Sequence, residues 1–476
     1  MSPPRLALLV LATLSPLPAA ADLYWRTDGT SGTWTGANWS GTATAAGGAA
    51  WVNSANVVFS EASSVIFATT PIGNVSVAAG KTVAITAAGT LGTGGNVRTF
   101  DVGTGAVLNW VGQDFSTAAG TGFIKNGAGV WNMGANGSSG TYSGGFTLNA
   151  GTVIASGVNN FGDQRMTING GTIESSGSKT FKPSSLVIGG DFKLTGSGND
   201  SWSAATVDLG GGTRVITQDA SGDRSFSGQI SNGGLTKAGS GVLVLSGANP
   251  YTGTTTVSSG ILKLASGGSI AGSAEIAIVS GATLDAGAGW SLGSGKKLSG
   301  GGTVIGGVTI QGTHAPTGSQ AVTGSLAYGG GSVFEWSLGA ASVSSGYDKV
   351  TVTGNLGAAA GAFRVMTDLA IDGTAADGFW TTRKTWGDIF TVTGTATGWA
   401  ADTAVAVYST ADVLRGGVGD YGNFSISGKT LTWTPVPEPS GALAGLLLGA
   451  GLLRRRRLLG TARGCKKARR LKIEDC

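Results

Sequence analysis

The chain has almost none of the residues on which metal centres and nucleophilic catalysis depend. Its 476 residues include one histidine, His314, and two cysteines, Cys465 and Cys476. The stretch 22–436 therefore contains no cysteine, which excludes disulfides as the source of its stability. One histidine without a nearby cysteine cannot supply the ligand set of a zinc site. We therefore expect no metal centre and no cofactor.

Charged residues are also scarce, at 12% of the chain, which is about half the usual proportion. The net charge of +5 is unevenly placed, because residues 437–476 hold ten basic and three acidic residues, and Arg5 adds one near the start. Residues 22–436 keep 20 basic and 23 acidic residues. A nucleic-acid-binding protein needs a basic face for counterion release. The sequence therefore predicts no nucleic-acid partner.

Glycine is abundant instead, with 86 residues, and 41% of the chain is hydrophobic. That hydrophobic share is too high for a disordered low-complexity chain, so we expect a packed core. Glycines followed by short β-rich runs recur at Gly151, Gly171, Gly212, Gly260, Gly281 and Gly302, with steps of 20, 41, 48, 21 and 21 residues. Several steps are close to one or two multiples of about 21, and a fixed period of roughly 20–50 residues is typical of a solenoid. An antiparallel sandwich, which also has regularly spaced short strands, is the alternative.

The clearest repeat covers residues 233–265. Its β-rich runs, each too short for a helix and suited to a strand, are 235–237, 242–245, 254–257 and 261–264. Lys263 stands between Leu262 and Leu264, so the two-residue period of a strand predicts buried leucines and an exposed lysine. A looser copy covers residues 122–156, in which Lys125 and Gly129 match Lys237 and Gly241, and Tyr142 matches Tyr251.

This unit resembles the autotransporter-associated β-strand repeat of bacterial surface proteins. The likeness rests on the Lys-x-Gly-x-Gly motif, the alternating apolar run and the Asn-x-Tyr-x-Gly motif of 249–253. The resemblance implies an all-β, right-handed parallel β-helix outside the cell, and it implies no enzymatic activity. We expect the β-solenoid at 65–369, a tryptophan-rich N-terminal cap at 22–64 and a C-terminal cap at 370–435. The alternative role for the N-terminal tryptophans is a platform on which sugar rings stack.

Within the predicted C-terminal cap we expect a final strand at 429–434 and a short helix near 381–389. At the other end, residues 1–21 have the pattern of a secretory signal peptide, with Arg5 before the apolar run 6–14. The small residues Ala19 and Ala21 predict cleavage before Asp22. Nine apolar residues are too few to span a bilayer.

The segment 436–457 suggests a membrane-sorting function. Its fourteen uncharged residues, 440–453, rise about 21 Å as a helix and predict a short transmembrane helix, aided by arginine side chains that reach the interface. The motif residues are Val436, Pro437, Glu438 and Pro439, and the basic membrane stop is Arg454, Arg455, Arg456 and Arg457.

This arrangement resembles the PEP-CTERM sorting signal. The resemblance implies recognition by an exosortase-type processing enzyme, a transient inner-membrane anchor and export to the envelope, cell surface or extracellular polysaccharide. Residues 458–476 form a basic tail that departs from the family pattern.

Three possible catalytic or binding patterns are best explained structurally. The G-x-S-x-G pattern at 289–293 needs a strand-to-helix turn with a histidine in reach, and no helix is predicted there. His314 is expected to be a polar turn residue. The charged group formed by Asp200, Asp208, Asp219, Asp223, Arg214 and Arg224 is expected to be solvated loop charge, with Ca²⁺ binding at loop oxygens as the alternative.

The leading functional prediction is a secreted or cell-surface structural or interaction protein, associated with extracellular polysaccharide and without enzymatic activity. A carbohydrate-binding adhesin is the second possibility. A polysaccharide lyase or hydrolase on a β-helix is the third.

Overall fold

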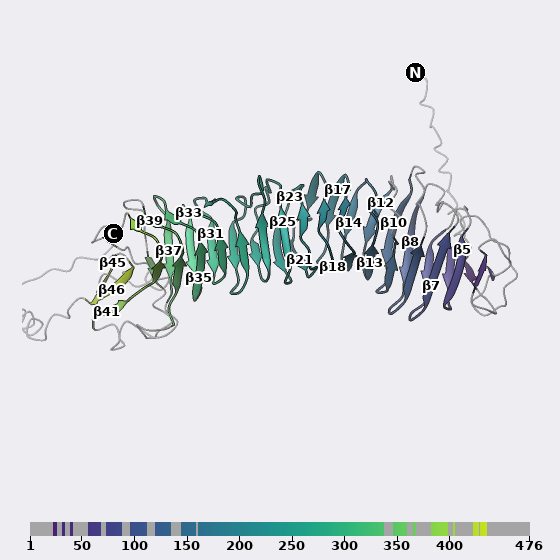
Figure 1. The fold of residues 1–476 in the computed structure, drawn as a ribbon, viewed down its shortest axis with the longest axis horizontal. Coiled ribbons are helices and arrows are strands. Elements are labelled where there is room, and N and C mark those ends of the chain that lie inside the picture. The colour runs from purple at the N-terminus through teal and green to yellow at the C-terminus, as the bar shows by residue number, and fades with distance from the viewer. Residues whose placement is uncertain are drawn as a thin grey trace, which may run out of the picture.

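The computed structural model describes residues 56–397 with several gaps, of which 160–337 is the longest continuous stretch. It also describes short strands on either side that reach residues 22 and 435. Residues 1–21 and 436–476 lie outside the described residues. In the described part the secondary structure consists of strands without a helix. Figure 1 shows these strands stacked along one long rod.

Three long sheets form the sides of the rod, and we number them by their order along the chain. The first sheet contains β1 (Asp22–Trp25), β3 (Trp39–Ser40), β4 (Asn56–Phe59), β6 (Val75–Val77), β8 (Val97–Val102), β10 (Gly122–Asn126), β12 (Gly145–Leu148), β14 (Met166–Ile168), β17 (Ser185–Ile188), β20 (Thr206–Asp208) and β23 (Gln229–Ser231). The second sheet contains β2 (Ser31–Thr33), β5 (Ser63–Phe67), β7 (Thr82–Ala87), β9 (Val107–Val111), β11 (Val130–Asn132), β13 (Thr152–Ala155), β15 (Thr172–Ser175), β18 (Phe192–Gly196), β21 (Thr213–Gln218), β24 (Gly234–Ala238), β26 (Thr255–Val257), β28 (Glu275–Ile278), β31 (Lys297–Gly300), β34 (Thr313–Pro316), β37 (Val333–Trp336) and β40 (Val365–Thr367). The third sheet contains β16 (Lys179–Phe181), β19 (Asp200–Trp202), β22 (Arg224–Phe226), β25 (Val242–Leu245), β27 (Ile261–Leu264), β29 (Thr283–Asp285), β32 (Thr303–Ile305), β35 (Ser319–Thr323), β38 (Lys349–Val352) and β42 (Phe390–Val392).

Two smaller sheets complete the described part of the chain. The fourth sheet contains β30 (Trp290–Leu292), β33 (Val308–Ile310), β36 (Leu326–Tyr328), β39 (Leu356–Ala358) and β43 (Ala396–Thr397). The fifth sheet contains β41 (Lys384–Trp386), β46 (Thr430–Pro435), β45 (Gly422–Ser427) and β44 (Thr403–Ala404).

Strands in the four solenoid sheets pair in parallel with the neighbouring coil, apart from the antiparallel pair β1–β3. Phe123 aligns with Phe146, and Phe146 aligns with Met166. Among the described residues the second sheet is the longest and runs along the rod from β2 to β40. This arrangement confirms the predicted parallel β-solenoid and shows that the alternative antiparallel sandwich is wrong.

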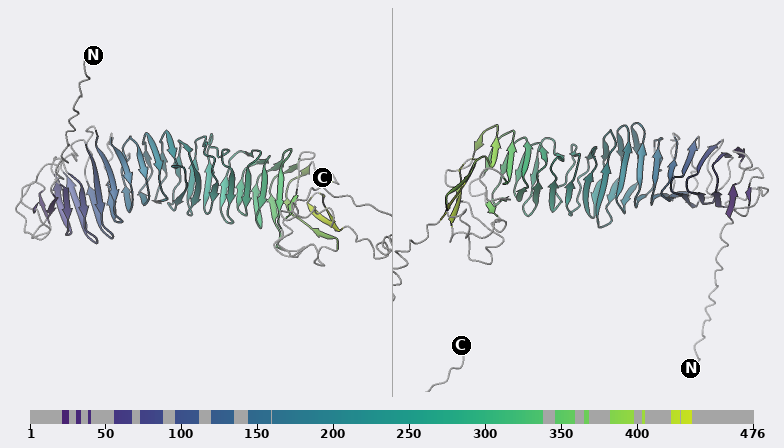
Figure 2. Two further views of the ribbon diagram at one scale, coloured as in Figure 1. Left: turned by 180° about the vertical axis from the view of Figure 1, so that it is seen from behind. Right: turned by 90° about the horizontal axis from the view of Figure 1, so that it is seen from below.

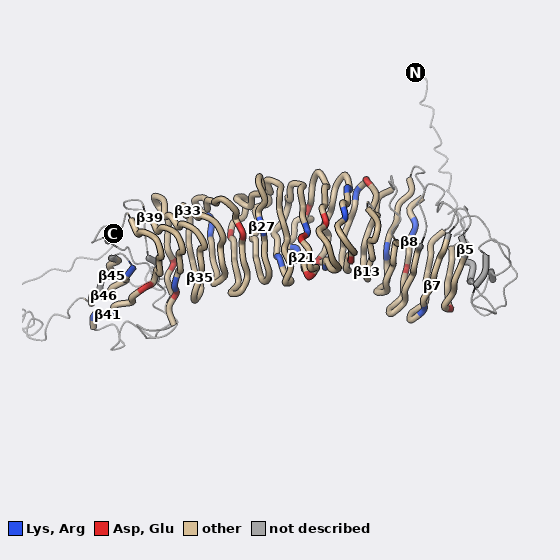
Figure 3. Tube along the Cα trace, in the orientation of Figure 1, with Lys and Arg blue, Asp and Glu red and all other residues tan. Residues whose placement is uncertain are grey.

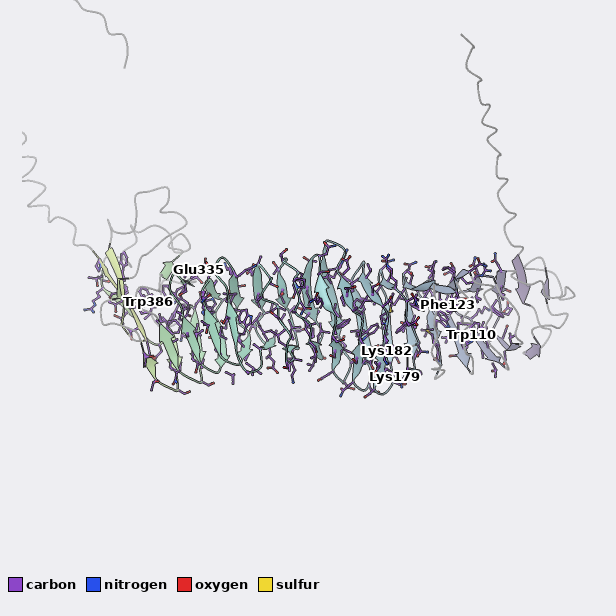
Figure 4. All side chains as sticks on the ribbon, turned by 90° about the horizontal axis from the view of Figure 1, so that it is seen from above. Trp110, Phe123, Lys179, Lys182, Glu335 and Trp386 are labelled. Atoms are coloured by element: carbon purple, nitrogen blue, oxygen red, sulfur yellow. The ribbon has the colours of Figure 1, made fainter. Side chains whose placement is uncertain are left out.

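The core follows from the two-residue period of the strands. Leu262 and Leu264 are buried while Lys263 points outward, as the sequence predicts. Aromatic side chains stack between coils in the interior, for example Phe100 on Trp131 with ring centroids 4.3 Å apart. Figure 4 shows the side chains along the rod, with Trp110 and Phe123 labelled in its N-terminal part. Both of these side chains are fully buried.

Parallel pairing extends into both segments predicted as caps. β1 pairs with β4 at the N-terminal end, and β42 pairs with β38 at the C-terminal end. The side chains of the N-terminal tryptophans at 25, 34, 39 and 51 lie outside the described residues.

The fifth sheet is antiparallel and lies at the C-terminal end of the rod (Figure 2). Its strand β46 confirms the strand expected at 429–434. The short helix expected near 381–389 is wrong, because 384–386 forms β41, in which Trp386 pairs with Leu431 and is buried. Within the described residues no helix is long and apolar enough to cross a membrane. The predicted transmembrane segment at 440–453 lies outside them.

Candidate functional site

The motif lysine of each repeat is buried at a corner of the solenoid. Lys237 is inaccessible to solvent, and its Nζ donates to the carbonyl oxygens of Ala238 at 3.0 Å, Gly239 at 2.8 Å and Ser259 at 3.0 Å. The first of these carbonyls ends β24, the second belongs to the turn that follows it, and the third belongs to the next coil. The ammonium therefore satisfies three carbonyl groups and ties two coils together.

The first repeat has the same arrangement. Lys125 is also fully buried, and its Nζ donates to Asn126 at 2.6 Å, Gly127 at 2.7 Å and Ala150 at 3.2 Å, in each case to the carbonyl oxygen. A three-carbonyl cage around an ammonium thus occurs twice, at the two positions that the sequence aligns. We call each of these sites a lysine corner.

Two of the recurring glycines, Gly151 and Gly260, leave room for the lysine corners. Gly260 has φ +65°, and a Cβ there would lie 2.4 Å from the carbonyl oxygen of Gly239 and 2.8 Å from Nζ of Lys237. Gly151, at the equivalent position of the first repeat, has φ +76° and would meet Nζ of Lys125 at 2.7 Å. Any side chain at these positions would displace the ammonium, and the backbone conformation also favours glycine.

The remaining motif residues build the loop of the second repeat. Asn249 accepts a hydrogen bond from the backbone N–H of Ile230 at 2.9 Å, and its Nδ2 donates to the carbonyls of Gly247 at 2.8 Å and Ser269 at 2.9 Å. Tyr251 is buried, with its hydroxyl 2.6 Å from Oγ1 of Thr255. The side chain of Asn249 thus hydrogen-bonds to the preceding coil at Ile230 and to the following coil at Ser269. Tyr142, the matching tyrosine of the first repeat, lies outside the described residues.

The two repeats occupy different corners of the rod. Lys125 lies on β10 of the first sheet, and its turn leads into β11 of the second sheet. Lys237 lies on β24 of the second sheet, and its turn leads into β25 of the third. One local structure therefore serves two corners. Sequence matching alone does not reveal that the two repeats lie at different corners. The repeat motif encodes the local structure of a corner, and it does not encode which two sheets that corner joins.

The predicted loop-charge group separates into buried and surface residues, and the prediction is wrong for Asp200 and Arg224. Nε of Arg224 lies 3.1 Å from Oδ2 of Asp200, and both side chains are almost fully buried. Ser175 donates to the carboxylate and accepts from Nη2 of Arg224 at 3.0 Å. Burial raises the pKa of Asp200, and Ser175 and Arg224 oppose that rise. Each charge is compensated inside the core, which marks a structural pair.

The other members of the group lie nearer the surface. Nζ of Lys193 lies 2.8 Å from Asp219, and its hydrogen bond is the main reason that the pKa of this carboxylate is lowered. Asp208 accepts from the backbone of Gly210 at 2.8 Å. In Figure 3 the charged positions are most closely spaced near β21. Among the described residues no group of three or more metal-ligating side chains is close enough to hold an ion.

His314 is not the expected turn residue. It lies on β34 and is fully buried, with Nδ1 2.6 Å from the Tyr328 hydroxyl and Nε2 hydrogen-bonded to Oε1 of Gln320. Because Oε1 can only accept, Nε2 carries the proton and Nδ1 accepts from Tyr328. Burial lowers the pKa of His314 to about 4. The ring is therefore neutral near pH 7 and serves a closed hydrogen-bond network.

The G-x-S-x-G pattern has no strand-to-helix turn. Ser291 lies within the strand β30, and its side chain is exposed. Of the predicted processing residues, Ala19, Ala21 and the motif 436–439 lie outside the described residues, as do the arginines 454–457. Asp22 begins β1. The cleavage and sorting roles therefore stay predictions.

Comparison with known protein families identifies the same two segments of the chain. A family model described as passenger-associated-transport-repeat matches residues 123–155 and 235–264. Both segments match passenger-associated transport repeats. Each matched segment contains one lysine corner. No curated protein and no solved structure shows significant similarity to the chain. The passenger-associated repeats and the β-solenoid together indicate a secreted or cell-surface protein.

Proposed function

We propose that this chain is a rod-shaped structural or interaction protein of the cell surface, without enzymatic activity, that associates with extracellular polysaccharide. The observation that carries the proposal is the use of the repeat residues. Lys125, Lys237 and Asn249 hydrogen-bond between coils and hold them together, and the buried Tyr251 hydroxyl bonds to Thr255. A repeat whose polar residues are committed to rigidity supports a role in presenting an extended surface.

The second part of the proposal concerns placement in the envelope. The chain enters the secretory route through residues 1–21 and is held briefly in the inner membrane by 440–453. An exosortase-type enzyme recognises Pro437, Glu438 and Pro439, cuts near them and releases the rod. The support for this step is the order of motif, apolar run and arginine cluster in the sequence.

Mass spectrometry of the protein recovered from the cell surface and medium tests this placement. The expected product begins at Asp22 and ends near Pro439. Changing Glu438→Gln should leave the apolar segment attached, so that the protein stays in the membrane fraction. The matched control Asp475→Asn, outside the motif, should be processed normally. Secreted protein that still carries Cys476 would contradict the sorting step while leaving the rod itself unaffected.

A carbohydrate-binding adhesin is the second candidate function. The N-terminal tryptophans that favour it in the sequence have side chains outside the described residues. A groove on the third sheet, lined mainly by polar residues, gives it separate support.

A further inference from the structure

A polar groove crosses the first strands of the third sheet. Its volume is about 410 Å³, and it extends over β16, β19, β22 and the edge of β25. The side chains that concern us line it from successive coils and are Lys179, Thr180, Asn199, Ser201, Asp223 and Ser225. We call this feature the Lys179 groove. In Figure 4, Lys179 and Lys182 are labelled close together along one side of the rod.

Lys179 is unusual because its ammonium has no bonded partner among the described residues. Other outward lysines are matched by an acid, as in Lys81–Glu61, Lys193–Asp219 and Lys297–Glu335. Some lysines that have no acidic partner are held in another way. Lys296 and Lys429 donate to carbonyl oxygens, and Lys349 lies over an aromatic ring.

The acid that aligns with Lys179 on the next coil is Asp200. Its carboxylate turns into the core, pairs with Arg224 and accepts from the backbone N–H of Lys179 at 3.1 Å, so it does not bond the Lys179 ammonium. The ammonium of Lys179, a residue that lines the groove, is therefore left without an acid partner among the described residues.

Hydroxyl groups from three coils line the same groove at regular intervals. Thr180, Ser201 and Ser225 are aligned in register on three neighbouring strands, so they repeat at the interstrand spacing of about 4.8 Å. Thr180 and Ser225 make no side-chain hydrogen bond in the described structure, and Ser201 has only a 3.5 Å contact to Ser203. A second row contains Asn199, whose Oδ1 accepts from the backbone of Asp223 at 2.9 Å. Its Nδ2 has no such bond and remains available as a donor.

We propose that the Lys179 groove binds an extended carboxylated polysaccharide whose chain follows the rod axis. This inference rests on the proposed function and specifies the chemistry of its partner. The ammonium of Lys179 pairs with a sugar carboxylate. The hydroxyl row and Asn199 hydrogen-bond to sugar hydroxyls, and Asp223 accepts from them. The groove is open and polar, so one groove binds weakly and retention in a matrix depends on many rods along one polymer.

The test is calorimetric titration of the purified full chain with polygalacturonate, using neutral dextran as the comparison polymer. The wild-type chain should bind polygalacturonate and not dextran. Lys179→Met should weaken binding by about tenfold, the loss expected for one charge-assisted contact. The matched control is Lys263→Met, which removes an outward lysine from the same sheet and should leave the affinity unchanged.

A second variant, Thr180→Val combined with Ser225→Ala, keeps the charge and removes two hydroxyls, so it should also weaken binding. Equal affinities for the two polymers, or equal losses in Lys179→Met and Lys263→Met, would overturn the inference. So would the absence of binding by the wild-type chain. Surface immunolabelling of cells that produce the same variants keeps the two proposals separate. Labelled cells with unchanged polymer affinity defeat only the groove, whereas unlabelled cells defeat the proposed surface function.

Discussion

The ammonium of Lys237 lies 3.0 Å from the carbonyl oxygen of Ser259, which belongs to the following coil. This contact joins two residues separated by one winding of the chain, and Lys125 makes the equivalent contact with Ala150. A residue that composition would place on the surface therefore holds the interior of the corner together.

Replacing the corner lysine should destabilise the rod. Lys237→Met keeps the length of the side chain but leaves three buried carbonyls without their donor, so the free energy of unfolding should fall by about 2–4 kcal/mol. The measurement is urea denaturation followed by circular dichroism. Lys263→Met, one coil further along and outward-facing, is the control and should cost less than about 0.5 kcal/mol. Equal losses in the free energy of unfolding for the two variants would mean that the lysine corner does not stabilise the rod.

The same lysine should make stability depend on alkaline pH. Burial lowers the pKa of Lys237 to about 8, from 10.5. Between those two values the unfolded chain keeps a proton that the folded chain has released, so the free energy of unfolding rises with pH in this window and is flat below it. Wild type minus Lys237→Met isolates the effect from Lys125. A difference that stays constant from pH 8 to 10.5 would contradict the lowered pKa.

The buried pair Asp200–Arg224 should behave as a unit. Removing one partner leaves an uncompensated buried charge, so Arg224→Met alone should cost about 3–5 kcal/mol. Adding Asp200→Asn should recover much of that loss, and a double-mutant cycle by urea denaturation measures the recovery. Strictly additive losses would show that the two side chains do not depend on each other.

His314 should weaken the C-terminal coils in acid. Its pKa is about 4 in the folded chain, against 6.5 as the ordinary value, because burial disfavours the charged ring. The unfolded chain therefore takes up a proton first as the pH falls from 6.5 to 4, and stability falls with it. The protection factors for hydrogen exchange in β34–β36, which correct for the intrinsic pH dependence of exchange, should fall over this range. His314→Gln, which cannot titrate, should lack that fall, and an unchanged acid response in this variant would locate the sensitive group elsewhere.

The sequence allows the solenoid to be predicted because glycine spacing and alternation are local signals. The same alternation also contains the signal for the buried charges. Lys237 is two residues from Leu235, and Arg224 is two residues from Phe226, so each shares the inward face of its strand. Treating charge as a mark of the surface hides that signal. The partners of these charges come from other coils, and pairing between coils cannot be obtained from spacing alone.

Two further features could not be predicted from the sequence. They are the different corners that the two repeats occupy and the Lys179 groove. Both depend on which face a strand occupies, and the repeat motif is the same at either corner. The groove also requires that Asp200 turn inward, which becomes apparent only when Arg224 and Ser175 are seen beside it.

The central claim is that the repeat lysines are interior clamps of a parallel β-solenoid, and lysine acetylation read by mass spectrometry tests it most directly. In the native protein at pH 7, Lys125 and Lys237 should stay unmodified while Lys193 and Lys263 react, because only the second pair is accessible to solvent. In urea all four should react alike. Native Lys125 and Lys237 that react as fast as Lys263 would contradict the claim.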